Sequence, residues 1–510
     1  MTYCCELIDE APKVKVCAIF VFALLVLSVS PVAQVVTESD AGRAIPTGSH
    51  ALSNAVVLPG VPYVWQEING LCNWAALSII FQYLGVDLTL HDVLAASGAG
   101  FSWAYVRSND TLFMFPGALF QQLEPTELMA DLYGLNLTLY FSSDTIGLQD
   151  QIDYIVSRGT SYGLVSNEEE SLDLVRFSID NGWPLLISID PQWLPAPDYD
   201  ILREQHSSGG AHGVVIVGYN DTAGTVTIVD PGVGSFGEYF GYPYDGRGNY
   251  SYVTYTNLNQ GWYARDYITM LLRPQPPAAE NPESLLGPYL RDRLLGEVNS
   301  YAPGSPYGYL WDFGEAGFRA MSTDFTPSGL SSYIHVFDGI EQEVSFKSFL
   351  LLFIGMGLEA QITLQYLSFR AALERVSFLM PNVNLTSFVA AAEAALPHFE
   401  ALADNRSLID PFDVARRDTL VSSTFHLIAD AYNSTGDLVG ALAPSADNLS
   451  LISTHLLYIA DSWRAAGEIL ATLWTNNPMV IYGPLIAIGA LVVGLVAVTA
   501  LRSIRRKPSQ

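Results

Sequence analysis

The chain has 510 residues, half of them hydrophobic, so its length allows two or three domains with sizeable cores. It carries 24 basic and 52 acidic residues, which gives a formal net charge of −28 at pH 7. Because binding to nucleic acid needs a basic face, this balance argues against a nucleic acid as partner. The acidity is more typical of a solvated surface than of a site for a cationic substrate.

Both ends of the chain are apolar. The run from Val16 to Val36 follows two lysines and predicts a signal peptide or an N-terminal anchor over residues 1–36. Residues 479–501 carry no charge and are long enough to cross a bilayer. The basic tail, residues 502–510, is then cytoplasmic by the positive-inside rule. We expect a protein of the cell membrane, single-pass or two-pass, with an extracytoplasmic body.

Sequons for N-glycosylation occur only between these apolar ends, which supports an outward-facing glycoprotein. Their asparagines are Asn109, Asn136, Asn220, Asn249, Asn384, Asn405, Asn433 and Asn448.

Cysteine usage singles out one residue of the body. Cys4, Cys5 and Cys17 precede or lie within the first apolar run, so Cys72 has no intramolecular disulfide partner there. A lone thiol outside the cell is an oxidation liability, which favours a chemical role for Cys72. A buried small residue and an intermolecular disulfide are the alternatives.

The segment around Cys72 predicts a loop that runs into a buried helix. Apolar residues recur at helical spacing from Trp74 to Leu84, and Gly85 is typical of a helix end with positive φ. Cys72 stands in the first turn, where free N–H groups and the helix dipole favour a thiolate. Gln66, six residues upstream, carries an amide suited to an oxyanion.

Between this helix and residue 272, the sequence predicts mainly helices first and then mainly strands. Thr89 is expected to cap a helix that ends near Gly98. Further helices are expected at Pro125–Tyr133, Asp144–Val156 and Glu168–Asp180, the last closed by Asn181-Gly182, with a half-buried strand at Leu135–Leu139, a strand at Leu185–Ile189 and edge strands in the Tyr-rich stretch Tyr239–Tyr267.

A β-hairpin is the natural interpretation of Val214–Tyr219 and Thr225–Val229, two β-branched runs separated by turn residues. With the hairpin centred at Asp221, His212 and Asp230 face each other directly across the pair. Directly opposed residues have Cβ atoms about 5 Å apart, which lets a carboxylate orient an imidazole. A slip of one residue would break this arrangement.

Cys72, His212 and Asp230 thus supply a nucleophile, a base and a residue that orients the base. Gln66-x5-Cys72 before a helix, His212 at a strand start and Asp230-Pro231 resemble the papain-like fold, and within it the double-glycine (bacteriocin-processing) peptidases. The resemblance implies that Gln66 is the oxyanion donor and the other three residues form the triad.

A second resemblance concerns the butirosin-biosynthesis acyltransferase-like family. It rests on Cys72–Tyr105 and Trp183–Asp190, and together the two resemblances cover about residues 60–272. That acyltransferase takes its acyl group from a cytosolic carrier protein, which an outward-facing body would not meet. We therefore prefer hydrolysis of a peptide or amide over acyl transfer to an amine. Asn73, where the peptidases usually carry Gly, keeps an inactive binding module as a third alternative.

Other candidate residues have plainer interpretations. His206 is expected in a solvated Ser/Gly loop rather than as a gate, and His91 on the surface of a first helical turn. The GxGxxG match at Gly232–Gly237 is followed by no helical pattern, so no dinucleotide site is expected. No cluster has zinc or calcium ligand spacing, so we expect no cofactor and no metal.

A Pro-rich linker is expected at residues 273–282, and a helical domain at residues 283–475. Its helices are predicted at Ile340–Phe369, Ser387–Leu402, Asp413–Tyr432 and Leu449–Leu473. The very apolar stretch Ser348–Leu358 is interrupted by Glu359, which indicates a core helix and not a membrane span.

The predicted fold class is therefore α+β. A papain-like domain at residues 50–272, with helices packed on an antiparallel sheet, precedes the all-α domain and the C-terminal transmembrane helix. The predicted function is a membrane-anchored thiol hydrolase that acts through an acyl-enzyme. The sequence does not indicate an oligomeric state.

Overall fold

The structure is a computed structural model. It describes residues 54–108, 123–145, 148–157, 159–204, 206, 208–234, 247–275, 282–296, 309–332, 344–409, 413 and 415–475. The predicted signal peptide or anchor, the predicted span at 479–501, the basic tail and the sequon at Asn109 lie outside these residues.

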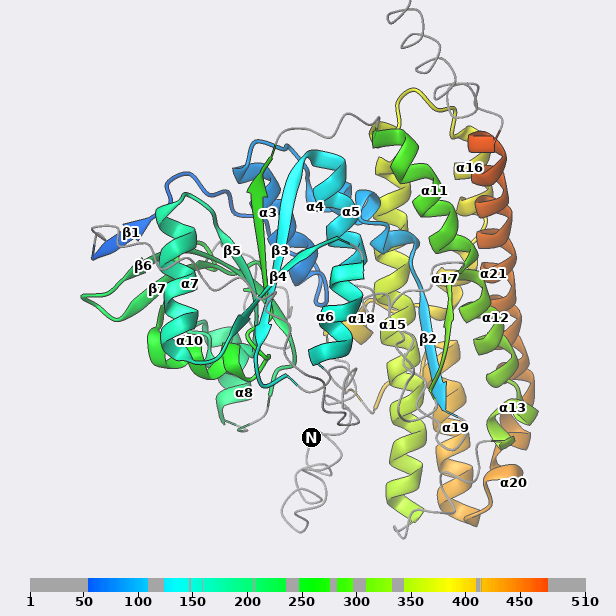
Figure 1. Cartoon of the computed structure of the whole chain (residues 1–510). Coiled ribbons are helices and arrows are strands. Elements are labelled where there is room, and N and C mark those ends of the chain that lie inside the picture. Colours follow the sequence, from blue (N-terminus) through cyan, green and yellow to red (C-terminus); the bar gives the residue numbers. More distant parts are fainter. Residues whose placement is uncertain are drawn as a thin grey trace, which may run out of the picture.

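The described residues form two parts that lie side by side (Figure 1). One part contains a large mixed sheet with helices around it, and the other consists mainly of long helices. This arrangement fits the predicted α+β class.

An eight-stranded sheet is the framework of the first part, with the order β4-β3-β9-β5-β6-β7-β8 and with β1 also paired to β6. All pairs are antiparallel except β3 with β4, which the sequence did not predict. The strands are β1 (Ala55–Val57), β3 (Leu135–Ser142), β4 (Ser161–Val165), β5 (Leu185–Ile189), β6 (His212–Asn220), β7 (Thr225–Val229), β8 (Ser251–Thr254) and β9 (Thr269–Pro274).

The helices of this part follow the local signals of the sequence. α3 (Cys72–Tyr83) begins at Cys72 and buries residues from Trp74 to Phe81, while Gly85 has φ +88° beyond its end. α4 (Leu90–Ala96) has the predicted Thr89 cap. The remaining helices are η1 (Ala99–Phe101), α5 (Leu123–Tyr133), α6 (Leu148–Ser157), α7 (Glu168–Asp180), η2 (Pro191–Trp193), η3 (Pro197–Tyr199), α8 (Asp200–Glu204) and α10 (Tyr255–Tyr263).

The β6–β7 hairpin has a different register from the predicted one. Asn220 pairs with Thr225 next to the turn, but a bulge between Ile216 and Gly218 shifts the register, so that Ile216 pairs with Ile228. Continued past the strand end, this register aligns Asp230 with Val214. The predicted direct opposition of His212 and Asp230 is therefore wrong, because the sequence gives no sign of the bulge or of a turn centred beyond Asp221. Both residues nevertheless stay on one face.

The Val217 carbonyl at this bulge accepts a hydrogen bond from the Leu58 N–H (2.8 Å), just after β1. A side chain at Gly218 would meet the Val56 carbonyl oxygen at 2.7 Å. Along the same edge, β6 thus pairs with β5 up to Ile216 and with β1 from Gly218 onward.

The second part is built from long helices and one strand. The strand β10 (Tyr309–Phe313) pairs with β2 (Ala104–Ser108) of the first part, which the sequence did not predict. The helices are α11 (Pro282–Leu295), α12 (Gly314–Asp324), α13 (Pro327–Ser332), α15 (Val344–Leu379), α16 (Thr386–Glu393), α17 (Leu396–Leu402), α18 (Arg406–Ile409), α19 (Leu420–Thr435), α20 (Leu438–Leu442), η4 (Ala443–Ser445) and α21 (Ala446–Thr475).

α15 is the one helix among the described residues that is apolar and long enough to cross a membrane, from Lys347 to Leu379. Of its most apolar window, 59% is buried inside the protein. Glu359 in the middle of α15 is fully buried and forms an ion pair with Arg416, while α19 and α4 pack along the helix. These contacts agree with the predicted core helix.

Three further expectations need correction. The described part of the Tyr-rich stretch, residues 247–267, forms one edge strand, β8, and not several, because Thr254 caps the helix α10 that follows it. β3 is buried on both faces rather than half-buried, because residues 137–142 are all buried, and α5 packs against the strand. The linker was predicted from Arg273, but β9 continues to Pro274.

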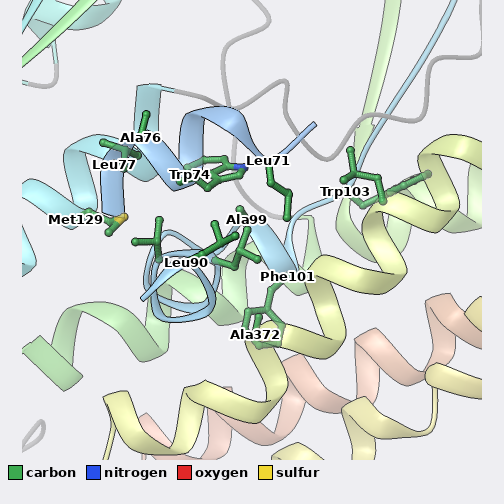
Figure 2. Packing of buried hydrophobic residues seen from close by; sticks show 14 of the residues in the cluster. Leu71, Trp74, Ala76, Leu77, Leu90, Ala99, Phe101, Trp103, Met129 and Ala372 are labelled. Atoms are coloured by element: carbon green, nitrogen blue, oxygen red, sulfur yellow. The ribbon is translucent and has the colours of Figure 1, made fainter. Parts of the chain in front are cut away.

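The interface between the two parts is tightly packed around η1. Figure 2 shows Phe101 and Ala99 of η1 lying among Leu71, Trp74 and Ala372. The Gln365 side-chain N–H donates to the Gly100 carbonyl (2.8 Å), and Arg375 of α15 pairs with Asp92 of α4 (2.6 Å). The Tyr105 hydroxyl donates to Asp324 (2.7 Å). The helical part therefore rests on the segment that directly follows α3 and α4.

We expect Gly100→Ala to destabilise the protein by about 1–3 kcal/mol, the usual effect of overpacking. The new Cβ would lie 2.3 Å from the Ala372 Cβ and 2.7 Å from the Ser368 carbonyl oxygen, so α15 would have to move. Urea unfolding of the full chain measures the effect. Gly357→Ala on α15 is the control, because its Cβ meets nothing within 4 Å and Ala favours a helix. Equal stability of the two variants would contradict the tight interface.

Candidate active site

Cys72 is the first residue of α3 and is partly exposed. Within the described residues no side chain caps this helix start, and the Asn73 N–H in its first turn is a hydrogen-bond donor to the thiol. Gly213 of β6 lets α3 come close, because a Cβ there would lie 3.1 Å from the Asn73 Cα and 3.4 Å from the Cys72 carbonyl carbon. The sequence thus places the thiol at a dipole-favoured helix start directly against a strand.

His212 begins β6 and is buried, with 5% of its surface exposed. Its Nε2 lies 2.7 Å from Asp230 Oδ1, and its ring is also a hydrogen-bond partner of the Cys72 thiol. Because Asp230 occupies Nε2, the nitrogen left for the thiol is Nδ1. The structure therefore brings together the three side chains that the sequence placed in one site.

Asp230 is held by several donors. Besides His212, its Oδ1 accepts the Gly232 N–H (2.8 Å), and its own N–H donates to the Gly248 carbonyl (2.8 Å). With only 1% of its surface exposed, the carboxylate is kept in one position by these contacts. It is thereby suited to fixing the tautomer of the imidazole.

Sequence reasoning missed Tyr199, which lies in η3 and is fully buried. Its hydroxyl is 3.1 Å from Asp230 Oδ2 and 3.2 Å from His212 Nε2. Burial and the charge of Asp230 hold the pKa of Tyr199 well above its usual value, so the phenol stays a neutral donor. In the sequence Tyr199 ends the pattern Pro197-Asp198-Tyr199, which is typical of a short turn and does not indicate a functional site.

The charges of the thiol and the imidazole are coupled. Burial opposes the thiolate, but the charge and hydrogen bond of His212, together with the N–H groups of Gly213 and Asn73, lower the pKa of Cys72 below its usual value. Burial also opposes the imidazolium, but Asp230 and Cys72 outweigh it and raise the pKa of His212. The geometry therefore favours a thiolate–imidazolium pair at neutral pH.

The segment that carries Gln66 is tied to the other side of the site. The Gln66 N–H donates to the Pro231 carbonyl (3.0 Å), directly after Asp230, and the Gln66 side chain is buried with 1% exposed. Glu67 follows with φ +64°, a left-handed backbone that is strained for a residue with a side chain. Its carboxylate holds His91 at 3.1 Å, so His91 is bound to this segment rather than being a plain surface residue.

The other residues singled out by the sequence lie as follows. Asn73, which replaces the usual Gly, directs its backbone N–H at the Cys72 sulfur, and its side-chain Nδ2 is buried. His206 is exposed in a turn, as expected for a solvated loop. No group of three ligating side chains suited to a metal ion occurs in the described ranges.

We expect Gly232→Ala to disable the site although none of Cys72, His212, Asp230 and Gln66 is replaced. The added Cβ would lie 2.5 Å from His212 Cε1 and 2.9 Å from Nε2, so the ring must leave Asp230. Without the His212 contact, burial would oppose the thiolate with less compensation, so the pKa of Cys72 would rise and its thiolate fraction near neutral pH would fall. The rate of alkylation of Cys72 by iodoacetamide between pH 5 and 9 measures this change.

Gly357→Ala is the matched control and should keep the alkylation rate of the unmodified chain, because its Cβ meets open space. Should Gly232→Ala alkylate like the unmodified chain at pH 6.5, the His212 contact does not lower the pKa of Cys72.

Comparisons with known proteins concern the part of the chain that carries this site. The model of the Peptidase C39-like family matches residues 59–258. Among solved structures, a protein from Bacillus anthracis named for its likeness to C39 peptidases is 14% identical, covers 43% of this chain and 98% of its own, and has a TM-score of 0.26, which is too low to support an argument. A search of curated proteins gives no match. The resemblance of residues 59–258 to the Peptidase C39-like family, a papain-like group, is thus confirmed.

Proposed function

We propose that the chain is a thiol hydrolase that cleaves a peptide or amide bond through a Cys72–His212–Asp230 triad. The observation that carries this proposal is the continuous contact from thiol to imidazole to carboxylate. Cys72 is half-buried as a residue, and His212 and Asp230 are buried. A structural thiol would need no basic partner.

In the first half of the reaction the Cys72 thiolate attacks the carbonyl carbon and forms a tetrahedral intermediate. The oxyanion is stabilised by the Cys72 backbone N–H at the start of α3 and by the Gln66 amide. The His212 imidazolium gives its Nδ1 proton to the departing amine. The C–N bond breaks, the amine leaves and a thioester on Cys72 remains.

In the second half, neutral His212 removes a proton from water, and the resulting hydroxide attacks the thioester. The C–S bond breaks, a carboxylic acid leaves, and the thiolate–imidazolium pair is restored. Asp230 stabilises the imidazolium in both halves, while Tyr199 holds the Asp230 carboxylate in place. An amine in place of the water would give acyl transfer by the same residues.

Membrane anchoring is part of the proposal. The uncharged apolar stretch at 479–501 begins four residues after α21 ends at Thr475 and is long enough for a span. Four of the seven described sequon asparagines, Asn249, Asn384, Asn405 and Asn433, are exposed, which would allow glycans on an outward-facing body, whereas Asn136, Asn220 and Asn448 are half-buried.

We expect an activity-based thiol probe to label Cys72 in the full chain, as mapped by mass spectrometry of the labelled peptide. Cys72→Ala should abolish both labelling and peptide cleavage. His212→Ala should lower the cleavage rate by a factor of about a thousand, since general acid–base catalysis contributes 10²–10⁴. His206→Ala, in the exposed turn, is the control and should cleave normally.

Two results would contradict this proposal. Peptide cleavage that survives Cys72→Ala would place the chemistry elsewhere. Product that forms only when an amine acceptor is added would show acyl transfer instead of hydrolysis.

A further inference from the structure

Tyr199 contacts two members of the triad, although it carries out no step of the proposed reaction. Its hydroxyl lies 3.1 Å from Asp230 Oδ2, 3.3 Å from Asp230 Oδ1 and 3.2 Å from His212 Nε2. The Tyr199 and His212 rings lie with their centroids 5.8 Å apart. All three residues are buried, so a phenol, an imidazole and a carboxylate meet away from solvent.

The hydrogen of the phenol has one suitable acceptor here. An ionised carboxylate only accepts hydrogen bonds, so His212 Nε2 must carry the hydrogen in its 2.7 Å contact with Asp230 Oδ1. Nε2 is then no acceptor, and Tyr199 donates to the carboxylate. Oδ1 already accepts from His212 and from the Gly232 N–H, whereas Tyr199 is the only donor to Oδ2 within the described part of the chain.

The position of this hydroxyl is fixed by contacts outside the triad. Asp198, which precedes Tyr199 in η3, is fully buried and accepts the Gly234 N–H (2.8 Å). Arg247 pairs with the other oxygen of Asp198 (3.3 Å). η3 is thereby fastened to the turn after β7, so the phenol is held beside the carboxylate independently of the imidazole.

The charges that act on His212 come from two other elements. Burial opposes the imidazolium, but the Asp230 carboxylate after β7 and the Cys72 thiolate on α3 raise the pKa of His212. The phenol of Tyr199 on η3 is neutral, and the charge of Asp198 behind it is paired. The pull of Asp230 on the imidazole is therefore the quantity that a donor on Oδ2 can change.

This pull has an upper limit that the chemistry sets. A strongly held imidazolium is a weak acid, yet the proposed mechanism requires it to protonate the departing amine. A hydrogen bond to Oδ2 stabilises the charge of the carboxylate without help from the imidazolium. A carboxylate with this donor therefore holds the proton of His212 less strongly than a carboxylate without it.

We propose that Tyr199 is a positioning residue that acts through Asp230: its hydroxyl takes up part of the carboxylate charge, so that the His212 imidazolium releases its proton readily to the leaving amine. The proposal rests on the thiol hydrolase function proposed above and adds a residue that controls its acid step. No bond forms or breaks at Tyr199, which keeps its hydrogen throughout the reaction.

The test titrates the imidazolium of the full chain with two alkylating agents. Iodoacetate and iodoacetamide both react with the thiolate by displacement of iodide, but only the anionic iodoacetate is attracted by a neighbouring imidazolium. The second-order rates at Cys72 are followed by mass spectrometry of the Cys72 peptide. The ratio of the iodoacetate rate to the iodoacetamide rate then falls as His212 loses its proton, and no substrate is needed.

In Tyr199→Phe the fall of this ratio should move to higher pH by about one unit, which corresponds to the net contribution of one hydrogen bond to a charged group. Peptide cleavage at neutral pH should slow about tenfold, because a weaker acid protonates the amine more slowly. Site-specific Tyr199→3-fluorotyrosine, whose hydroxyl is a stronger donor, should move the fall of the ratio to lower pH. This second variant carries the test if the phenylalanine variant does not fold.

Tyr219→Phe is the matched control. Tyr219 lies on β6, as His212 does, is buried, and donates its hydroxyl to a carboxylate, that of Asp180 (2.7 Å). It contacts no member of the triad through this hydroxyl. Its loss should leave the pH at which the ratio falls unchanged.

The possible failures are distinguishable. A ratio that falls at the same pH in Tyr199→Phe and in Tyr219→Phe would overturn the role of Tyr199 and leave the hydrolase proposal standing. A shift to lower pH in Tyr199→Phe would mean that the hydroxyl only keeps the imidazole near the carboxylate, which also overturns it. If Cys72 of the unmodified chain prefers iodoacetate at no pH, no imidazolium lies beside the thiolate, and the proposed function fails as well.

Discussion

The hydrogen bond between His212 and Asp230 depends on one extra residue in β6. Beside the turn, Asn220 pairs with Thr225. If this register ran unchanged along the whole hairpin, Asp230 would align with Val215, whose side chain lies on the sheet face opposite to His212. The bulge at Val217 shifts the pairing by one, so that Asp230 aligns with Val214 and shares the face of His212. The orientation of the imidazole, and through it the charge of the thiol, follows from this single irregularity.

Residues far from the site keep the bulge in place. The Val217 carbonyl accepts a hydrogen bond from the N–H of Leu58, the residue after β1. Only a glycine at position 218 leaves room for the Val56 backbone. These contacts join residues about 160 positions apart in the chain, so no local pattern could have predicted them. The helix caps were predictable because they involve only residues that are neighbours in the sequence. Examples are the Thr89 cap of α4 and the end of α7 at Asn181-Gly182.

The site shows the same division between local and distant information. Cys72 at a helix start and His212 at a strand start were visible in the sequence, because each is set by its own segment. Tyr199 was not, since its hydroxyl reaches Asp230 only through the folding of η3 against the hairpin. Nor was the role of α15 visible: its apolar pattern indicates burial, but not that its partners are the segment before α3 and the helix α4.

The left-handed backbone at Glu67 is linked to the helical part through α4. A left-handed residue beside Gln66 persists only when its surroundings hold it, and here His91 of α4 does so through an ion pair. α4 is in turn held by Arg375 of α15 through Asp92, which also completes the cap of α4. The proposed oxyanion segment is therefore linked to α15 by two ion pairs, Glu67 with His91 and Asp92 with Arg375, in addition to the direct packing of Leu364 against Gly70.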